Sequence, residues 1–336
     1  MENKTKIVTL PNGLRIVFEK NKQAKTCSAV IRVASGVSFE TPETAGTSHF
    51  IEHMVFKGSQ KRSALDIAVE MDEIGGYLNA YTARENTCFY ARMLSEHTEK
   101  ALDILCDMVR NPRLDEKDIE LEKSVIKEEI SMYEDSAEDL CADTFYRNVW
   151  KGSMLGCDIL GSAETVDAVT KESLEAHMKK FYVPERTVIS ISGNFDEKSA
   201  LRICKGYFAD LENTGFEMNP VFAEYNPHTV TVKKSVTQNQ IILGFPGVPL
   251  AIACPEAKIT LLDSLAKRMN WLETVLPQLG CSNARCVTAR AEEEVTKCRE
   301  TYDFATSRAV ARLNILLELT APYVKVGGAV LAMKGT

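Results

Sequence analysis

The chain has 336 residues, of which 45% are hydrophobic and 26% are charged, which excludes a disordered protein and predicts a globular one with two or three domains. The net charge is −7, with 29 basic and 38 acidic residues in 1–247 but 11 and 9 in 248–336. An acidic body of this kind argues against nucleic-acid binding across the whole chain.

Apolar and polar residues alternate, or recur at helical spacing, in a clear order through the first two hundred residues. A turn at Pro11–Gly13 separates the first two strands, and Asp115 is a suitable N-cap for a long helix. The order of strands and helices, which lacks the regular alternation of a doubly wound fold, predicts an α+β domain. The predicted strands are 6–10, 14–20, 26–36, 86–94 and 187–195, and the predicted helices are 47–57, 63–76, 96–111, 114–136 and 172–185.

The pattern changes near residue 247. Residues 228–247 resemble the strand at 26–36, which hints that a second copy of the first domain begins near 226. The sequence after Gly247 does not continue this second copy of the first domain. Instead a short helix-like piece at 250–256 is followed by a strand, a helix and two strands, which is the alternation of a parallel α/β sheet. These four elements are predicted at 258–263, 264–280, 284–293 and 302–310.

Neither a membrane nor a secreted setting is indicated by the sequence. No apolar run approaches the roughly 20 residues that span a bilayer, and the N-terminus lacks the apolar segment of a signal peptide. The ten cysteines include no CxxC pair. We therefore expect reduced thiols, a cytoplasmic location and no membrane partner.

The sharpest chemical signal is the H-x-x-E-H pattern of His49, Glu52 and His53. Positions four apart share one face of a helix, so both imidazoles can point at one ion. Neutral imidazole suits zinc, and a catalytic zinc takes a third protein ligand and keeps one position for water. Glu52 lies beside the same face, where it can take a proton from that water.

A third ligand is expected from a carboxylate on another helix. Glu129, in the sequence VIKEEI, is the candidate. Glu122 lies two helical turns earlier on the same face and could hold a ligand in place. The alternative for Glu122 is a solvated position on an acidic helix, which is the more common role of such a residue.

Four segments together resemble the insulinase/pitrilysin family of zinc endopeptidases, and most of all its small members that are similar to mitochondrial processing peptidase. The resemblance covers residues 1 to about 247 and implies His49, His53 and Glu129 as zinc ligands, Glu52 as general base and Glu122 as a supporting carboxylate. It also implies a two-layer domain of sheet and helices. The segments are HFIEHMVFKG, GGYLNAYTARENTCFY, VIKEEISMYED and KKFYVPERTVISISGNFD.

The same resemblance implies that Asn79 and Ala80 line a substrate groove, where an extended peptide adds to the edge of a strand. Considered without the resemblance, Asn79 is better interpreted as a turn residue after Gly75 and Gly76.

Residues 244–336 resemble another family, the glucose-inhibited division protein B methyltransferases, which modify N7 of a guanine in small-subunit ribosomal RNA with S-adenosylmethionine. The resemblance rests on GFPGVPLAIACPEAKITLLDSLAKRMNWL, TARAEE, YDFATSRAVARL and VKVGGAVLAMKG. An acid at a strand end beside a glycine-containing loop suits a nucleotide-like ligand. Considered alone, Asp263 would be a helix cap and Arg308 a surface charge. The cofactor contacts that this resemblance implies are Phe245, Asp263, Ala291, Glu292 and Arg308.

Both resemblances are incomplete. The segment R-x-x-x-G-L-A-Y, with which the second peptidase domain helps to hold substrate, has no counterpart here. The methyltransferase glycine loop is replaced by residues that include Gln238, Gln240 and Ile242, which cannot approach a cofactor as glycine does. The RNA-facing start of that family is missing, and its members continue beyond Thr336.

We interpret the chain as a chimera joined at residues 244–247, where both families carry a GFPG-like sequence, either by gene fusion or by an error in assembling reads. The expected parts are a zinc-peptidase domain at 1–225, the opening strands of a truncated second domain at 226–247, and a partial Rossmann-like methyltransferase segment at 248–336.

The favoured function is a zinc endopeptidase that acts on a peptide substrate, with turnover impaired by loss of the second domain unless a homo-oligomer or partner subunit completes the chamber. One alternative is a fragmentary methyltransferase that binds S-adenosylmethionine and ribosomal RNA. The other is a non-catalytic product whose unpaired strand edges favour aggregation.

Overall fold

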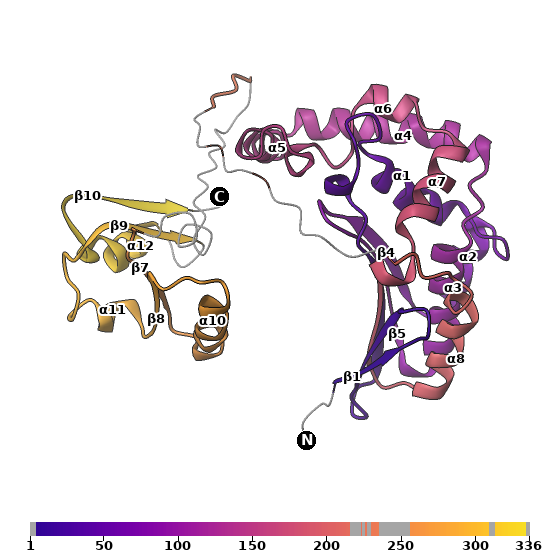
Figure 1. Cartoon of the computed structure of the whole chain (residues 1–336), viewed down its shortest axis with the longest axis horizontal. Coiled ribbons are helices and arrows are strands. Elements are labelled where there is room, and N and C mark those ends of the chain that lie inside the picture. The colour runs from indigo at the N-terminus through magenta and orange to yellow at the C-terminus, as the bar shows by residue number, and fades with distance from the viewer. Residues whose placement is uncertain are drawn as a thin grey trace. The chain divides into compact units, whose positions relative to one another are not determined.

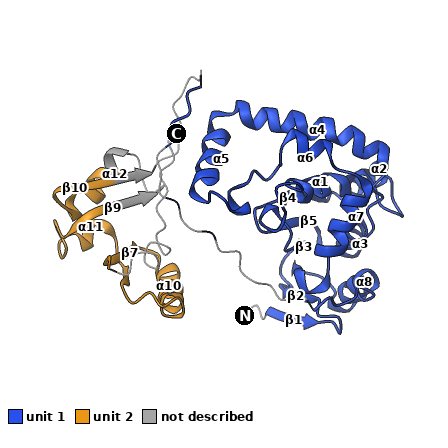
Figure 2. Ribbon diagram, turned by 45° about the horizontal axis from the view of Figure 1, so that its top comes forward, with its two compact units in different colours: residues 1–240 blue, residues 241–336 orange. Residues whose placement is uncertain are grey.

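The computed structural model describes residues 5–215, 223, 226, 230–234, 256–308 and 313–333, without the side chains of 306–308, 313–315 and 331–333. The chain divides into two compact units, Met1–Gln240 and Ile241–Thr336 (Figure 2). Each unit has its own sheet or sheets and is described by itself.

Unit 1 is built on a six-stranded mixed sheet with the order β1-β2-β6-β3-β5-β4 (Figure 1). Strand β6 arrives last in the sequence but lies between β2, to which it is parallel, and β3, to which it is antiparallel. Strand β4 pairs with β5 on one side and forms one end of the sheet. The strands are β1 (Thr5–Thr9), β2 (Arg15–Lys20), β3 (Thr26–Val33), β4 (Tyr77–Thr82), β5 (Thr87–Leu94) and β6 (Thr187–Gly193).

Helices cover one face of this sheet, with α3 packed on β5 and α8 packed on α3 (Figure 1). The helices cover this face because buried and more exposed residues alternate along the strands. In β3, Ala29 and Ile31 are buried, whereas Ser28 and Val30 are only partly covered. The helices of unit 1 are α1 (Thr47–Met54), α2 (Ala64–Glu73), α3 (Thr98–Arg110), α4 (Glu116–Asp135), α5 (Ala137–Val149), α6 (Ala163–Asp167), α7 (Lys171–Phe181) and α8 (Glu197–Phe208).

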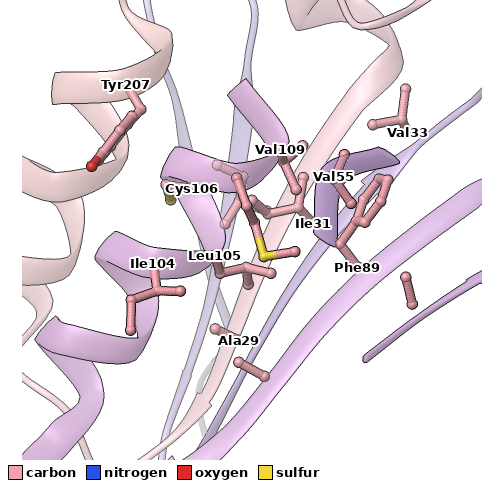
Figure 3. Packing of buried hydrophobic residues seen from close by; sticks show 14 of the residues in the cluster. Ala29, Ile31, Val33, Val55, Phe89, Ile104, Leu105, Cys106, Val109 and Tyr207 are labelled. Carbon is pink, nitrogen blue, oxygen red and sulfur yellow. The ribbon is translucent and has the colours of Figure 1, made fainter. Parts of the chain in front are cut away.

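The core of unit 1 lies between the sheet and these helices. Figure 3 shows Leu105 and Val109 of α3 directed at Ile31 of β3 and Phe89 of β5, and all four side chains are fully or almost fully buried. Tyr207 of α8 belongs to the same cluster. The cluster also includes Met54 of α1 and Ile126 of α4, so burial of its apolar surface stabilises the packing of α1 on α4.

The α+β expectation is confirmed, because the sheet is mixed and the helices gather on one of its faces. The expected strands and helices of 1–195 are present, and Asp115 does cap α4 by accepting a hydrogen bond from Lys117 N–H (2.9 Å). Four elements of unit 1 were not predicted from the sequence, namely β4, α5, α6 and α8. The strand expected at 228–247 is wrong for Val230–Lys234, which form no strand, and its remaining residues lie outside the described ones.

The described residues of unit 2 form two pairs of parallel strands. Strands β7 (Ile259–Asp263) and β8 (Ala284–Thr288) are connected by α10 (Ala266–Gln278) and pair in parallel, which confirms the expected strand–helix–strand pattern. The strand predicted at 284–293 is too long, because residues 291–293 lie in a short helix. A small cluster around Leu276 and Cys281 packs against both strands. The other elements are α11 (Ala291–Glu294), β9 (Tyr302–Arg308), α12 (Leu313–Thr320) and β10 (Val324–Met333), with β9 and β10 parallel.

Within the described residues, no helix combines the length and the apolar character that a bilayer span requires. The described cysteines are all free thiols.

Candidate metal centre

Helix α1 brings the two histidines of the H-x-x-E-H pattern together. The ring centroids of His49 and His53 are 4.6 Å apart, with the rings edge to face, as expected for side chains one helical turn apart. The N-cap of this helix is Gly46, which has a positive φ of 93° and no room for a Cβ beside the Leu160 carbonyl. Glycine is therefore required where the chain turns into this helix.

Helix α4 presents two carboxylates to α1. Ile119, Glu122 and Ile126 are buried on one stripe, and Glu129 continues that stripe. The two isoleucines therefore anchor the helix while Glu122 and Glu129 face the histidines.

Three donor atoms converge at the contact of α1 and α4. Glu129 Oε2 lies 3.7 Å from His49 Nε2 and 3.4 Å from His53 Nε2. The ligand atoms of these residues all lie within 4.8 Å of one another. Donors that bind one ion tetrahedrally at about 2.1 Å are about 3.4 Å apart, so the residues present fit a zinc ion.

Glu122 lies behind His53, on the side away from Glu129. Its Oε1 accepts a hydrogen bond from His53 Nδ1 (2.8 Å), and its Oε2 pairs with Lys57 Nζ (2.5 Å). This contact leaves His53 Nε2 free to bind a metal and fixes the orientation of the ring. Glu122 is 3% exposed, so the alternative of a solvated surface position is wrong.

The surroundings shift the pKa values of the two histidines in opposite directions. Burial, together with the neighbouring His53, lowers the pKa of His49 to about 4. Burial opposes protonation of His53 as well, but Glu122 and Glu129 outweigh it and raise the pKa of His53 to about 9. The hydrogen bond from His53 lowers the pKa of Glu129. The centre thus holds anionic carboxylates ready for a cation.

Glu52 lies on the same helix and is held from the sheet. Thr82 Oγ1, at the end of β4, donates a hydrogen bond to Glu52 Oε2 (2.5 Å). Burial raises the pKa of the Glu52 carboxyl against the opposing effect of this hydrogen bond. A carboxyl group with a raised pKa is suited to take up a proton and return it near neutral pH.

The predicted groove residues lie at the edge of the sheet. Asn79 and Ala80 are in β4, so the turn interpretation of Asn79 is wrong. Asn79 Oδ1 accepts a hydrogen bond from Ala80 N–H (2.8 Å), while Asn79 Nδ2 donates to the Tyr77 hydroxyl (2.8 Å). Since β4 pairs with β5 on one side only, its other edge is open to an extended peptide within the described part of unit 1.

The structure describes the side chains of only three of the five cofactor contacts predicted by the methyltransferase resemblance. Asp263 ends β7, while Ala291 and Glu292 begin α11 after β8, so these three residues lie at the carboxyl ends of paired strands. The Asp263 carboxylate accepts a hydrogen bond from Leu265 N–H (2.8 Å) and pairs with Arg268 (3.2 Å). Arg308 is the last residue of β9, and its side chain lies outside the described residues, as do Phe245, Gln238, Gln240 and Ile242.

Three residues that support the centre were not predicted from the sequence: Lys57, which pairs with Glu122, Thr82, which bonds to Glu52, and Glu40, which binds the backbone at the start of α1. Lys57 could have been found, because it follows His53 by one helical turn. Thr82 and Glu40 reach α1 from other elements, and nothing in their local sequence indicates this.

Comparison with known families agrees with the geometry in unit 1. Residues 15–163 match the family described as insulinase, peptidase family M16, and residues 168–276 match the M16 inactive domain. This chain is similar to the insulinase family of peptidases. Residues 243–336 also match the rRNA small subunit methyltransferase G family, so two of the matches overlap at 243–276.

Several relatives of the insulinase-like part carry names that include zinc. The uncharacterized zinc protease YmxG of Bacillus subtilis is 39% identical over 240 residues, which are 71% of this chain and 58% of the relative. The probable mitochondrial-processing peptidase subunit beta of Arabidopsis thaliana is 37% identical over 209 residues, which are 62% of this chain and 39% of the relative. The chain therefore spans about half the length of the curated relatives it matches.

Solved structures show the same fold. A protease from Helicobacter pylori has a TM-score of 0.61 at 19% identity and matches 66% of this chain and 54% of its own. A putative M16-like peptidase from Alicyclobacillus acidocaldarius has a TM-score of 0.56 at 24% identity, over 67% of this chain and 53% of its own.

Proposed function

We propose that unit 1 carries the centre of a zinc-dependent endopeptidase. The observation that carries this proposal is the convergence of His49, His53 and Glu129, from two helices, with Glu52 beside them. His49, His53 and Glu129 would hold the metal, and Glu122 would hold His53 in its binding orientation.

Zinc bound there would supply a Lewis acid and lower the pKa of a bound water to about 7. Glu52 would take a proton from the attacking water and pass it to the leaving amine, while Thr82 holds one carboxylate oxygen in place. The open edge of β4, with Asn79 and Ala80, would bind the peptide backbone as an added strand.

Two substitutions test this assignment. Zinc content measured by metal analysis should be about one ion per chain in the wild type and should fall strongly in Glu129→Gln, which removes a charged ligand. Glu52→Gln should retain zinc but lose cleavage of a fluorogenic peptide library by at least about a hundredfold. Cleavage that survives Glu52→Gln would show that Glu52 is not the base.

We further propose that turnover requires a second subunit, either another copy or a different chain. This is supported by the extent of the match, since the insulinase-like part of the chain covers only 58% and 54% of the length of two of its relatives. Positioning of substrate between two halves contributes a large share of catalysis, so a lone half would bind zinc but turn over slowly. Cleavage rate per chain that rises with protein concentration would support assembly, and a constant rate would contradict it.

A second candidate function is binding of S-adenosylmethionine by unit 2, which the methyltransferase G match at 243–336 favours. The local contacts of Asp263 with Leu265 and Arg268 count against it, because they occupy the carboxylate that a ribose would need. Calorimetry with S-adenosylmethionine decides, and binding of millimolar strength or weaker would leave this function without support.

A further inference from the structure

The two histidines of the centre are held in different ways. His53 is oriented by the carboxylate of Glu122. His49 Nδ1, by contrast, is buried and has no hydrogen-bond partner among the described residues. No described side chain behind His49 therefore fixes its ring by a hydrogen bond at Nδ1, and the ring position depends on packing and on the backbone from which it projects.

That backbone is the first turn of α1, where helical N–H groups lack partners inside the helix. The N-cap, Gly46, has no side chain that could accept hydrogen bonds from these N–H groups. Glu40, which lies six residues before Gly46 in the sequence, accepts them instead. Its Oε2 accepts the Gly46 N–H (2.8 Å) and its Oε1 accepts the Ser48 N–H (2.6 Å), so both oxygens of one carboxylate bind the start of the helix.

Glu40 is itself only 7% exposed, which is unusual for a carboxylate unless it is fully hydrogen-bonded. The turn that it holds has a second attachment through Ser48. Ser48 Oγ lies 3.0 Å from Ser35 Oγ and 3.3 Å from His177 Nε2. The residue next to His49 is thus fixed through its N–H and through its hydroxyl.

We propose that Glu40 is the positioning residue of the metal centre. By binding both ends of the Gly46–Ser48 segment, it sets where α1 begins and so where His49 lies relative to His53 and Glu129. Metal sites tolerate ligand displacements of only about 0.5 Å, so a small shift of this turn would weaken binding. The inference rests on the proposed zinc site.

The experiment compares two carboxylate caps in the intact chain. Asp196 caps α8 by accepting the Ser199 N–H (2.8 Å), and α8 packs on α3. Glu40→Ala and Asp196→Ala each remove a carboxylate that caps a helix, so both substitutions should lower stability. Zinc affinity is measured by competition with a chelator, and the absorption spectrum of the cobalt(II)-substituted protein reports the geometry of the ligands.

Glu40→Ala should weaken zinc binding at least about tenfold and alter the cobalt spectrum, whereas Asp196→Ala should change neither. The zinc affinity of Glu40→Gln, which retains a single acceptor oxygen, should lie between those of Glu40→Ala and the wild type. If Glu40→Ala does not fold, the comparison of Glu40→Gln with Asp196→Ala tests the inference. Equal zinc affinities in the Glu40 and Asp196 variants would overturn the inference. A wild-type chain that binds no zinc would instead overturn the proposed function.

Discussion

At the scale of single residues, His177 of α7 shows how a buried polar group ties stability to pH. Its Nε2 lies 2.8 Å from Ser35 Oγ, and its ring packs on Phe181 with centroids 4.5 Å apart. Burial, with smaller effects from Lys180 and Arg186, lowers the pKa of His177 from 6.5 to about 3. The folded protein therefore keeps this imidazole neutral at mildly acid pH.

This shift predicts a loss of stability in acid. Below pH 6.5 the unfolded chain binds a proton at His177 that the folded chain does not, until the pH reaches about 3. The free energy of unfolding should thus fall as pH drops through this window, by up to about 1.4 kcal/mol per pH unit from this group.

Urea unfolding at a series of pH values measures that slope. His177→Gln should have a shallower slope than the wild type between pH 6.5 and 4, and the two slopes should coincide above pH 7. Parallel curves across the whole range would contradict a buried, neutral His177.

At the scale of elements, the centre depends on α1, which contacts both α4 and β4. Strand β4 supplies Thr82 to Glu52 and also offers an open edge. The same strand would then bind the peptide substrate and orient the general base, so β4 would fix the position of Glu52 relative to the peptide.

Ala80→Pro tests the edge of β4. The substitution removes the N–H that Ala80 donates to Asn79, and with it a donor for an added strand. We expect kcat/KM for peptide cleavage to fall at least about tenfold while zinc content stays at the wild-type level. Unchanged cleavage would mean that peptides do not bind along this edge, and loss of zinc would mean that the strand itself was disturbed.

The sequence predicted the parts of the centre that obey local periodicity. Spacing of four placed His49 and His53 on one face, and spacing of seven placed Glu122 and Glu129 on another. The position of β4 was missed because GGYLNAYT begins with two glycines and contains an asparagine, which favour a turn until pairing with β5 overrides that preference. Contacts of Thr82 and Glu40 with α1 depend on tertiary packing, which no local pattern encodes.

At the scale of the whole molecule, the family matches overlap at 243–276. Strand β7 pairs in parallel with β8, and α10 connects the two strands. The boundary between the units lies after Gln240. We therefore propose that 259–278 belongs with the methyltransferase-like segment and that the chain is a chimera joined near 244–247. Long sequencing reads from the source genome test its origin, since uninterrupted reads across this point would exclude an assembly error.

Removal of unit 2 should leave the metal centre intact, because the predicted ligands and their contacts all lie in unit 1. We expect a chain of residues 1–240 to bind zinc as tightly as the full chain and to self-associate less. The reason is that β7 and β8 pair only with each other among the described residues, which leaves strand edges unpaired.

Metal analysis and light scattering after size-exclusion chromatography measure both quantities. A shorter chain that loses zinc would show that unit 2 supports the centre, contrary to this prediction.

The late arrival of β6 has a consequence for biosynthesis. Because β6 (Thr187–Gly193) joins β2 to β3 in the middle of the sheet, a nascent chain cannot complete its sheet until that strand has left the ribosome. Helices α1 and α4 are made much earlier but lack a finished support until then. A peptidase built in this way would stay latent until β6 has emerged, and loading of its metal would follow completion of the sheet.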